Sequence, residues 1–219
     1  MTKTRNKRIW FNVLIYGISV LPLLVFGLVY DRLPERLATH FGVDGQPNGW
    51  MDKSDFLLFS VGLLIGVPLL MQFSRRLDPK RENYSKFERA FYIVRLLTSL
   101  LISVIFTVSL FYNLGYAVNI QMVVLLGIGV MFLVLGNVTP QFRFNYFMGI
   151  RTPWTLSNEE VWRRTHRLAG PFMMIAGVVS LVAAFLPGVV AFWLMGVAVV
   201  LAALVPTLYS YWIFRHVSK

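Results

Sequence analysis

The chain has 219 residues, of which 57% are hydrophobic and only 14% charged, and its formal net charge is +11. Soluble domains contain about 45–50% apolar and about 25% charged residues, so this composition excludes a water-soluble fold. The sequence contains no cysteine, which excludes disulfides and thiolate metal sites.

Six long apolar runs predict membrane-spanning helices. A helix rises 1.5 Å per residue, so roughly 20 residues cross the ~30 Å hydrocarbon layer of a bilayer. Backbone groups in lipid must be hydrogen-bonded within the segment, which a helix achieves and an isolated strand does not. We therefore predict an all-α, polytopic integral membrane protein with six transmembrane helices. The runs cover residues 9–30, 56–73, 91–112, 118–136, 168–186 and 189–214.

The first run follows four basic residues, as the core of a secretory signal does, but it is 22 residues long. Signal cores have about 7–15 residues and precede a cleavage site of small residues. Here Val29-Tyr30-Asp31-Arg32 follows instead. We interpret the run as a retained first span.

Basic residues alternate between the two sides of the predicted bundle. Of the 21 Lys and Arg residues, 17 lie in the amino-terminal segment, the loops 74–90 and 137–167, and the tail, whereas three lie in loop 31–55. Cytoplasmic loops retain Lys and Arg, so both termini are predicted to be cytoplasmic and loop 31–55 extracytoplasmic. The basic surfaces are then expected to attract anionic membrane lipids rather than to bind nucleic acid directly.

The outer loop is predicted to form a small hairpin-like lid. Its centre, residues 42–49, is rich in Gly, Pro, Asn and Asp, which supply turn geometry. Phe41 and Trp50 flank this turn, and tryptophan prefers the headgroup level of a membrane. Ser54 precedes the second span and is a candidate amino-terminal cap for it.

One charge, Arg95, lies inside the third predicted span. Its long side chain is expected to reach back to the membrane interface, at a cost far below that of a charge at mid-bilayer. The alternative is a functional cation buried between helices. No span contains Asp or Glu, which disfavours an ion-coupled carrier, since such carriers usually need an intramembrane carboxylate.

The inner loop 137–167 carries the most unusual polar sequence. Ser157 and Glu160 match a capping box at the start of an amphipathic helix over residues 158–167, which leads into the fifth span. In one interpretation, Arg151, Trp154 and Trp162 only anchor the loop at the headgroup boundary. In the other, the loop is a rigid platform on which Asn145, Arg151, Trp154 and His166 face a cavity or a partner.

Catalytic and metal chemistry have little support in the sequence. His40 with Asp44 and Asp52 offers at most a weak metal site, because their spacing matches no known motif. His166 with Glu159 or Glu160 is a conceivable proton-transfer pair. We expect no catalytic residue, no metal site, no cofactor and no enzymatic activity.

The inner loop sequence GNVTPQFRFNYFMGIRTPWTLSNEEVWRRTHRLAG resembles the signature of the SdpI-like family of bacterial membrane proteins. The outer loop sequence LPERLATHFGVDGQPNGWMDK resembles a short domain of unknown function that often precedes this signature. The sequence thus divides into residues 1–73, with the outer loop, and residues 74–219, the SdpI-like region with spans three to six.

The resemblance implies a multi-pass protein of the bacterial cytoplasmic membrane that gives immunity to a secreted peptide toxin. It also implies that a small winged-helix transcriptional repressor is held at the membrane when the toxin is present. The alternatives that remain are a transporter of small molecules or lipids, and a membrane-embedded enzyme built on Arg151, Trp154, Glu160 and His166.

The resemblance and the predicted topology together select two sets of site residues. The candidates for toxin binding in the outer loop are Pro34, His40, Phe41, Asp44 and Trp50. The candidates for partner binding in the cytoplasmic motif are Asn137, Asn145, Gly149, Arg151, Pro153, Trp154, Glu160, Trp162, His166 and Arg167.

Overall fold

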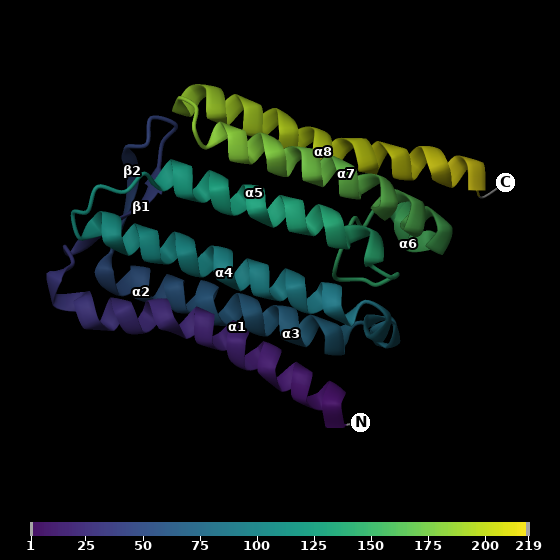
Figure 1. Cartoon of the computed structure of the whole chain (residues 1–219), viewed down its shortest axis with the longest axis horizontal. Coiled ribbons are helices and arrows are strands. Elements are labelled where there is room, and N and C mark those ends of the chain that lie inside the picture. The colour runs from purple at the N-terminus through teal and green to yellow at the C-terminus, as the bar shows by residue number, and fades with distance from the viewer. Residues whose placement is uncertain (1, 218–219) are drawn as a thin grey trace. The chain divides into compact units, whose positions relative to one another are not determined.

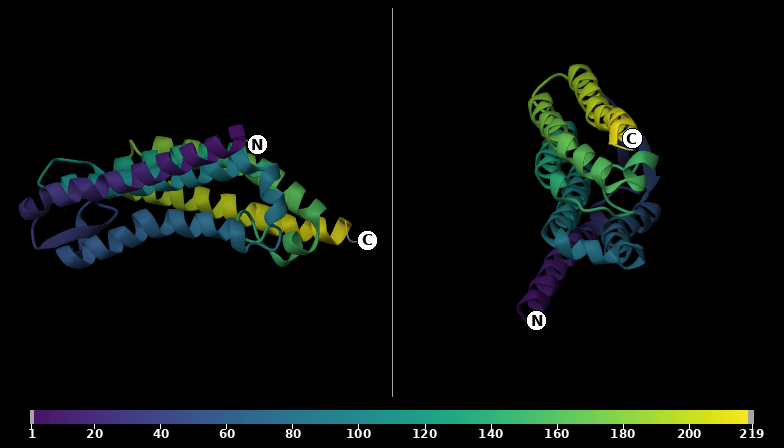
Figure 2. Two further views of the ribbon diagram at one scale, coloured as in Figure 1. Left: turned by 90° about the horizontal axis from the view of Figure 1, so that it is seen from below. Right: turned by 90° about the vertical axis from the view of Figure 1, so that its right-hand side faces the viewer.

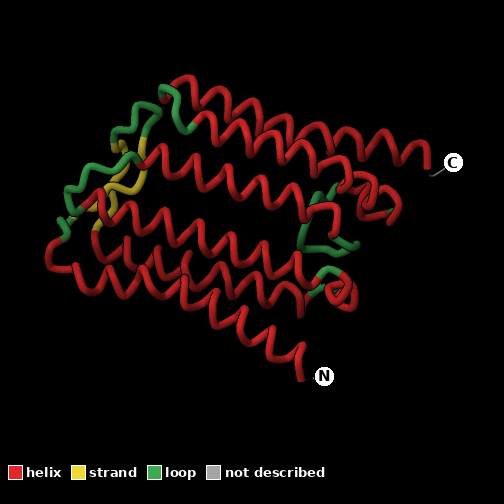
Figure 3. Tube along the Cα trace, in the orientation of Figure 1, coloured by secondary structure: helices red, strands yellow, loops and turns green. Residues whose placement is uncertain are grey.

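The structure is a computed structural model that describes residues 2–217. Within this range, six helical stretches are long and apolar enough to cross a membrane, which confirms the all-α polytopic prediction. Figure 1 labels the elements, and Figure 3 shows in yellow the one hairpin of strands among the described residues. The helices are α1 (Thr2–Val29), α2 (Lys53–Val61), α3 (Val67–Leu77), α4 (Glu88–Asn113), α5 (Ile120–Val138), α6 (Pro153–Ser157), α7 (Glu159–Ala183) and α8 (Gly188–Val217), and the strands are β1 (Arg36–Phe41) and β2 (Pro47–Asp52).

Residue contacts divide the chain into two compact units. The first comprises Met1–Met71 and Arg95–Gly127, and the second comprises Gln72–Val94 and Ile128–Lys219. Each unit contains its own buried hydrophobic cluster. The sequence-based division cuts the chain once, after residue 73, whereas each of these units combines two separate segments. The sequence-based division stays a prediction.

The core of the first unit is an aromatic cluster contributed by α1, α2 and α4. Phe56 is stacked on Phe106 with ring centroids 5.2 Å apart, and Phe26 lies 6.0 Å from Phe56. Leu37 of β1 is fully buried in the same cluster. Van der Waals packing, which drives helix association where water is absent, therefore joins three helices and the hairpin.

The hairpin in the outer loop confirms the predicted turn. β1 and β2 are antiparallel, with Ala38 opposite Trp50 and irregular pairing on both sides of His40. The side chain of Asn113, the last residue of α4, binds both backbone groups of Ala38: Ala38 N donates to Oδ1 at 2.7 Å, and Nδ2 donates to Ala38 O at 3.1 Å. Asn113 thus bonds both backbone groups of Ala38, as a residue of a neighbouring strand would, and it fixes the hairpin to the end of α4.

A buried lysine closes the base of the hairpin. The Lys53 ammonium group donates to the carbonyl oxygens of Tyr30 at 3.3 Å and Leu33 at 3.4 Å, and it pairs with the Glu35 carboxylate at 3.2 Å. Helix α2 begins at Lys53 itself, and the preceding cap residue makes no side-chain capping bond. The prediction that Ser54 caps this helix is therefore wrong.

Arg95 does not extend to the membrane interface. Its side chain is buried, with 1% of the residue exposed, and its guanidinium donates to Asn12 Oδ1 at 2.9 Å and to the Pro68 carbonyl at 3.4 Å. The segment Gly62–Gly66, directly before α3, is a π-helix, a distortion that is frequent at functional sites. The prediction of a side chain reaching the interface was wrong, because polar groups of α1 and α3 solvate the charge between the helices.

In the second unit, glycines bring α5 and α7 into backbone contact. A Cβ atom on Gly136 would lie 2.6 Å from the Gly170 carbonyl, and one on Gly177 would lie 2.8 Å from the Gly129 carbonyl. These distances leave no space for a larger residue, and small residues are typical of such close helix interfaces in membranes. Helices α7 and α8 run side by side and pack extensively on each other (Figure 2). The loop between α5 and α7 thus starts and ends on helices with a fixed spacing.

Candidate functional site

The segment between α5 and α7, residues 139–158, folds without strands, and we call it the signature loop. It contains a 3-10 turn (Thr139–Gln141) and the short helix α6. Its buried aromatic side chains, Phe142 and Phe144, join a cluster with Tyr84 and Trp162. A packed loop without regular pairing must find hydrogen-bond partners for its buried backbone groups, and side chains provide them here.

Asn145 is the internal template of the signature loop. It is fully buried, and its Oδ1 accepts from the backbone N–H groups of Phe147 at 2.9 Å and Met148 at 2.6 Å. Its Nδ2 donates to the carbonyl oxygens of Arg143 at 2.9 Å and Met148 at 3.0 Å. The amide therefore uses two donors and its acceptor on the backbone, which an aspartate in its place could not do.

His166 holds the next turn of the loop. Its Nε2 accepts from the Ile150 N–H at 3.0 Å, so Nδ1 carries the ring proton and donates to the Trp162 carbonyl at 2.8 Å. The imidazole is fully buried and stacks on the Trp162 indole with centroids 4.1 Å apart. Gly149 passes directly over it with φ +108°, and a Cβ atom there would lie 2.2 Å from Nε2. Only glycine meets both requirements.

Asp78 connects the signature loop to the loop between α3 and α4. It is 2% exposed, and its carboxylate accepts from Lys80 N at 2.7 Å, Tyr84 Oη at 3.0 Å and Tyr146 N at 2.9 Å. Asn83 adds a second connection through Nδ2, which donates to the Phe144 carbonyl at 2.9 Å. Three donors on one buried carboxylate stabilise its charge and hold the two loops together.

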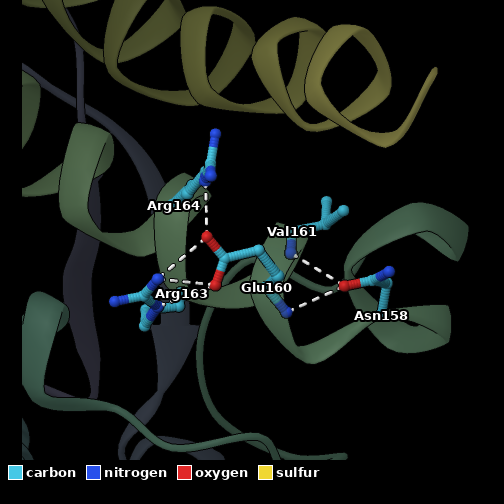
Figure 4. A network of polar contacts seen from close by, with 5 residues as sticks. All are labelled: Asn158, Glu160, Val161, Arg163 and Arg164. Atoms are coloured by element: carbon cyan, nitrogen blue, oxygen red, sulfur yellow. Dashed lines mark hydrogen bonds and ion pairs between the residues drawn. The ribbon is translucent and has the colours of Figure 1, made fainter. Parts of the chain in front are cut away.

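The start of α7 differs from the predicted capping box. Asn158 is the cap, and its Oδ1 accepts from the N–H groups of Glu160 at 2.8 Å and Val161 at 3.2 Å (Figure 4). Ser157 instead ends α6 and donates to the Trp154 carbonyl at 3.0 Å. The capping box occurs one helix earlier, where Thr152 and Thr155 satisfy each other's backbone N–H groups.

Glu160 is engaged by two arginines of its own helix. Arg163 Nη2 lies 2.6 Å from Oε2, and Arg164 Nε lies 2.6 Å from Oε1 (Figure 4). Because His166 binds backbone groups through both ring nitrogens and is fully buried, it shares no proton with Glu160 or with the exposed Glu159. The proton-transfer alternative for this histidine was wrong.

The ten candidate residues of the cytoplasmic motif separate into two groups. Asn145, Trp162 and His166 are buried, and the Trp162 indole N–H donates to the Phe142 carbonyl at 2.9 Å. These three, with Gly149, position the loop rather than present polar atoms at its surface. The other members reach the surface fully or in part: Asn137, Arg151, Pro153, Trp154, Glu160 and Arg167. A binding role for that second group stays a prediction.

The five candidates in the outer loop do not form one cluster. His40 is exposed, and its Nδ1 lies 2.5 Å from Asn48 Oδ1, while Asp44 Oδ1 accepts from the N–H of the turn residue Gln46 at 3.1 Å. Phe41 packs edge-on against Tyr112. Pro34 and Trp50 are exposed, Trp50 by 51%. Across residues 2–217 no group of three or more His, Cys, Asp or Glu side chains is arranged to hold a metal ion.

A cavity of about 450 Å³ opens beside the signature loop, entirely within the second unit. Its walls come from the loop between α3 and α4, from residues 140–144 and from the first turn of α7. Sequence patterns indicated neither the cavity nor the buried residues Asp78, Asn83 and Tyr84. The one available signal was the Asp78-Pro79 pair in a loop whose charges are mostly basic.

Comparisons with known proteins identify relatives of both loops. Residues 141–210 match the model of the SdpI/YfhL protein family, and residues 17–65 match that of a domain of unknown function, DUF1648. The immunity protein SdpI of Bacillus subtilis (strain 168) is 25% identical over 177 residues, which cover 81% of this chain and 83% of that protein. No solved structure matches. The resemblance of the inner loop to the SdpI-like family, and of the outer loop to the domain of unknown function that accompanies it, is thereby confirmed.

The glycine over His166 gives a first prediction. Gly149→Ala places a methyl group against the ring at a positive φ, so we expect a loss of more than about 1 kcal/mol in unfolding free energy. Limited proteolysis should cut the signature loop faster in this variant. Gly196→Ala is the matched control, since its Cβ atom would meet no atom within 4 Å. Equal cleavage of the two variants would contradict the described role of Gly149.

Tyr84 gives a prediction about pH. Burial, and then the hydrogen bond to the Asp78 carboxylate, raise the pKa of the Tyr84 phenol above its ordinary value. Because this pKa is higher in the folded than in the unfolded state, the protonated phenol stabilises the fold below about pH 10. This stabilisation decreases as the pH rises further. The stability advantage of the wild type over Tyr84→Phe should therefore shrink above about pH 10, by up to about 1.4 kcal/mol per pH unit. Denaturant unfolding in detergent measures it, with the exposed Tyr116→Phe as control. A constant difference would refute the prediction.

Proposed function

We propose that this protein is an immunity protein of the bacterial cytoplasmic membrane that protects the cell from a secreted antimicrobial peptide. The observation that carries the proposal is the similarity to the immunity protein SdpI over most of both chains. The match to the family model, residues 141–210, includes most of the signature loop and the buried network around Asn145 and His166.

The proposed orientation places the signature loop in the cytoplasm and the hairpin outside. Two sets of contacts support it, each within one unit. Asp78 and Asn83 bind the signature loop, so the two basic inner loops lie on one side of the second unit. Asn113 binds Ala38, so the hairpin lies at the carboxyl end of α4. The loops with most Lys and Arg are then together on the side where such residues are retained.

The hairpin offers the surface for the toxin. Trp50 and Val43 expose 51% and 44% of their surface on a hairpin that Lys53 and Asn113 hold in place. A membrane-active peptide is apolar on at least one face, and a rigid exposed tryptophan is a typical anchor for such a contact. A preorganised surface also avoids the entropy cost of ordering a loop on binding.

A second role, retention of a small winged-helix repressor at the membrane, is proposed for the inner loops. Toxin binding can change the far side only if it favours one arrangement of the helices over another. Helix α7 is continuous from Glu159 to Ala183, so a displacement along it reaches the first turn, where Glu160, Arg163 and Arg164 face solvent at least in part.

Survival of a toxin-sensitive bacterium tests the proposal. Expression of the wild-type chain should raise the peptide dose for half-maximal killing, and Trp50→Ala should lower this dose again by about tenfold or more, because a buried tryptophan contact contributes about 2 kcal/mol or more. His40→Ala should weaken protection less. Trp193→Ala is the control, an exposed tryptophan in α8, and membrane levels are compared by immunoblot. Unchanged killing of wild-type cells across a panel of secreted peptides would exclude immunity, and substrate-dependent flux in vesicles would favour a transporter.

A further inference from the structure

The cavity beside the signature loop has uncompensated charge at its rim. The Arg143 side chain makes no hydrogen bond or ion pair with any residue of the described chain, and the Lys86 ammonium group donates only to the neutral Asn83 Oδ1, at 2.9 Å. Among the acidic lining residues, Glu160 is already paired with Arg163 and Arg164. Glu159 alone remains to oppose two cations. The rim can therefore accept a carboxylate from outside the chain.

The most buried residues that line the cavity are aromatic, and we call them its floor. Phe142, Phe144 and Trp162 line it, each at least 92% buried. Their nearby polar atoms are used internally: the Trp162 indole N–H donates to the Phe142 carbonyl, and the Phe144 carbonyl accepts from Asn83. The parts of these rings that line the cavity can still contact an apolar group, beside the polar lining.

We propose that this cavity binds a peptide segment of a soluble cytoplasmic protein in which an acidic side chain neighbours an apolar one. The carboxylate contacts Arg143 and Lys86, and the apolar side chain packs on the aromatic floor. The proposal deepens the repressor-binding role and rests on it, because it names the kind of segment that the partner presents.

A peptide fits the cavity better than a lipid headgroup does. All three wall segments are loops or helix ends, which a soluble protein reaches from the solvent. A peptide offers both a carboxylate for the two cations and an apolar side chain for the aromatic rings, whereas a phosphate diester headgroup offers only the anion. A volume of about 450 Å³ accommodates a few side chains rather than a folded element.

Binding of short probes to the full-length protein in phosphatidylcholine nanodiscs tests the proposal. The probes are the blocked tetrapeptide acetyl-Gly-Asp-Phe-Gly-amide, its analogue with Asn in place of Asp, and glycerol phosphate as the soluble form of a lipid headgroup. Calorimetric titration should show saturable binding of the acidic peptide, at least about tenfold tighter than either other probe. The Arg143→Gln variant should lose this preference.

Arg89→Gln is the matched control, since Arg89 is exposed, carries the same charge and does not line the cavity. It should bind like the wild type. Absence of peptide binding, equal binding by Arg143→Gln, or tighter binding of glycerol phosphate would each overturn the proposal. Because cell survival is not part of this experiment, immunity can stand when the peptide site fails, and the site can stand when immunity fails.

Discussion

The signature loop depends on one constraint: backbone groups buried at the end of a helix bundle must be hydrogen-bonded although no sheet or long helix pairs them. In this protein, buried polar side chains meet that requirement from three directions. Asn145 acts from within the loop, His166 from the helix that follows, and Asp78 from a loop about 70 residues earlier. The loop is therefore positioned by side chains that themselves lie on different elements.

The same constraint explains why motif residues differ in their roles. Asn145 and His166 would be natural candidates for contact with a ligand, but their polar atoms are used by the backbone. Their effect on function passes through the shape of the loop. Arg143 and Lys86, which belong to no predicted set, are the charged groups that the network leaves available at the cavity.

Hydropathy was enough to predict the six helices, because a bilayer demands long apolar runs whatever their partners are. The hairpin followed from the turn residues between Phe41 and Trp50. Interactions that depend on tertiary contacts were not predictable from local patterns. Ser157 matched a capping box, but it is the last residue of α6, and Asn158 is the cap of α7. Arg95 is hydrogen-bonded to Asn12 of another helix, and Asn113 is hydrogen-bonded to Ala38, 75 residues away.

The Asp78 carboxylate keeps the signature loop ordered through its bond to the Tyr146 amide, and hydrogen exchange of that amide tests this role most directly. Asp78→Asn removes the charge and turns an N–H group toward donors, so exchange at Tyr146 should accelerate by about tenfold or more, while the Val179 amide within α7 stays protected. Glu82→Gln, an exposed change in the same loop, should leave both rates unaltered. An unchanged rate at Tyr146 in Asp78→Asn would contradict the account.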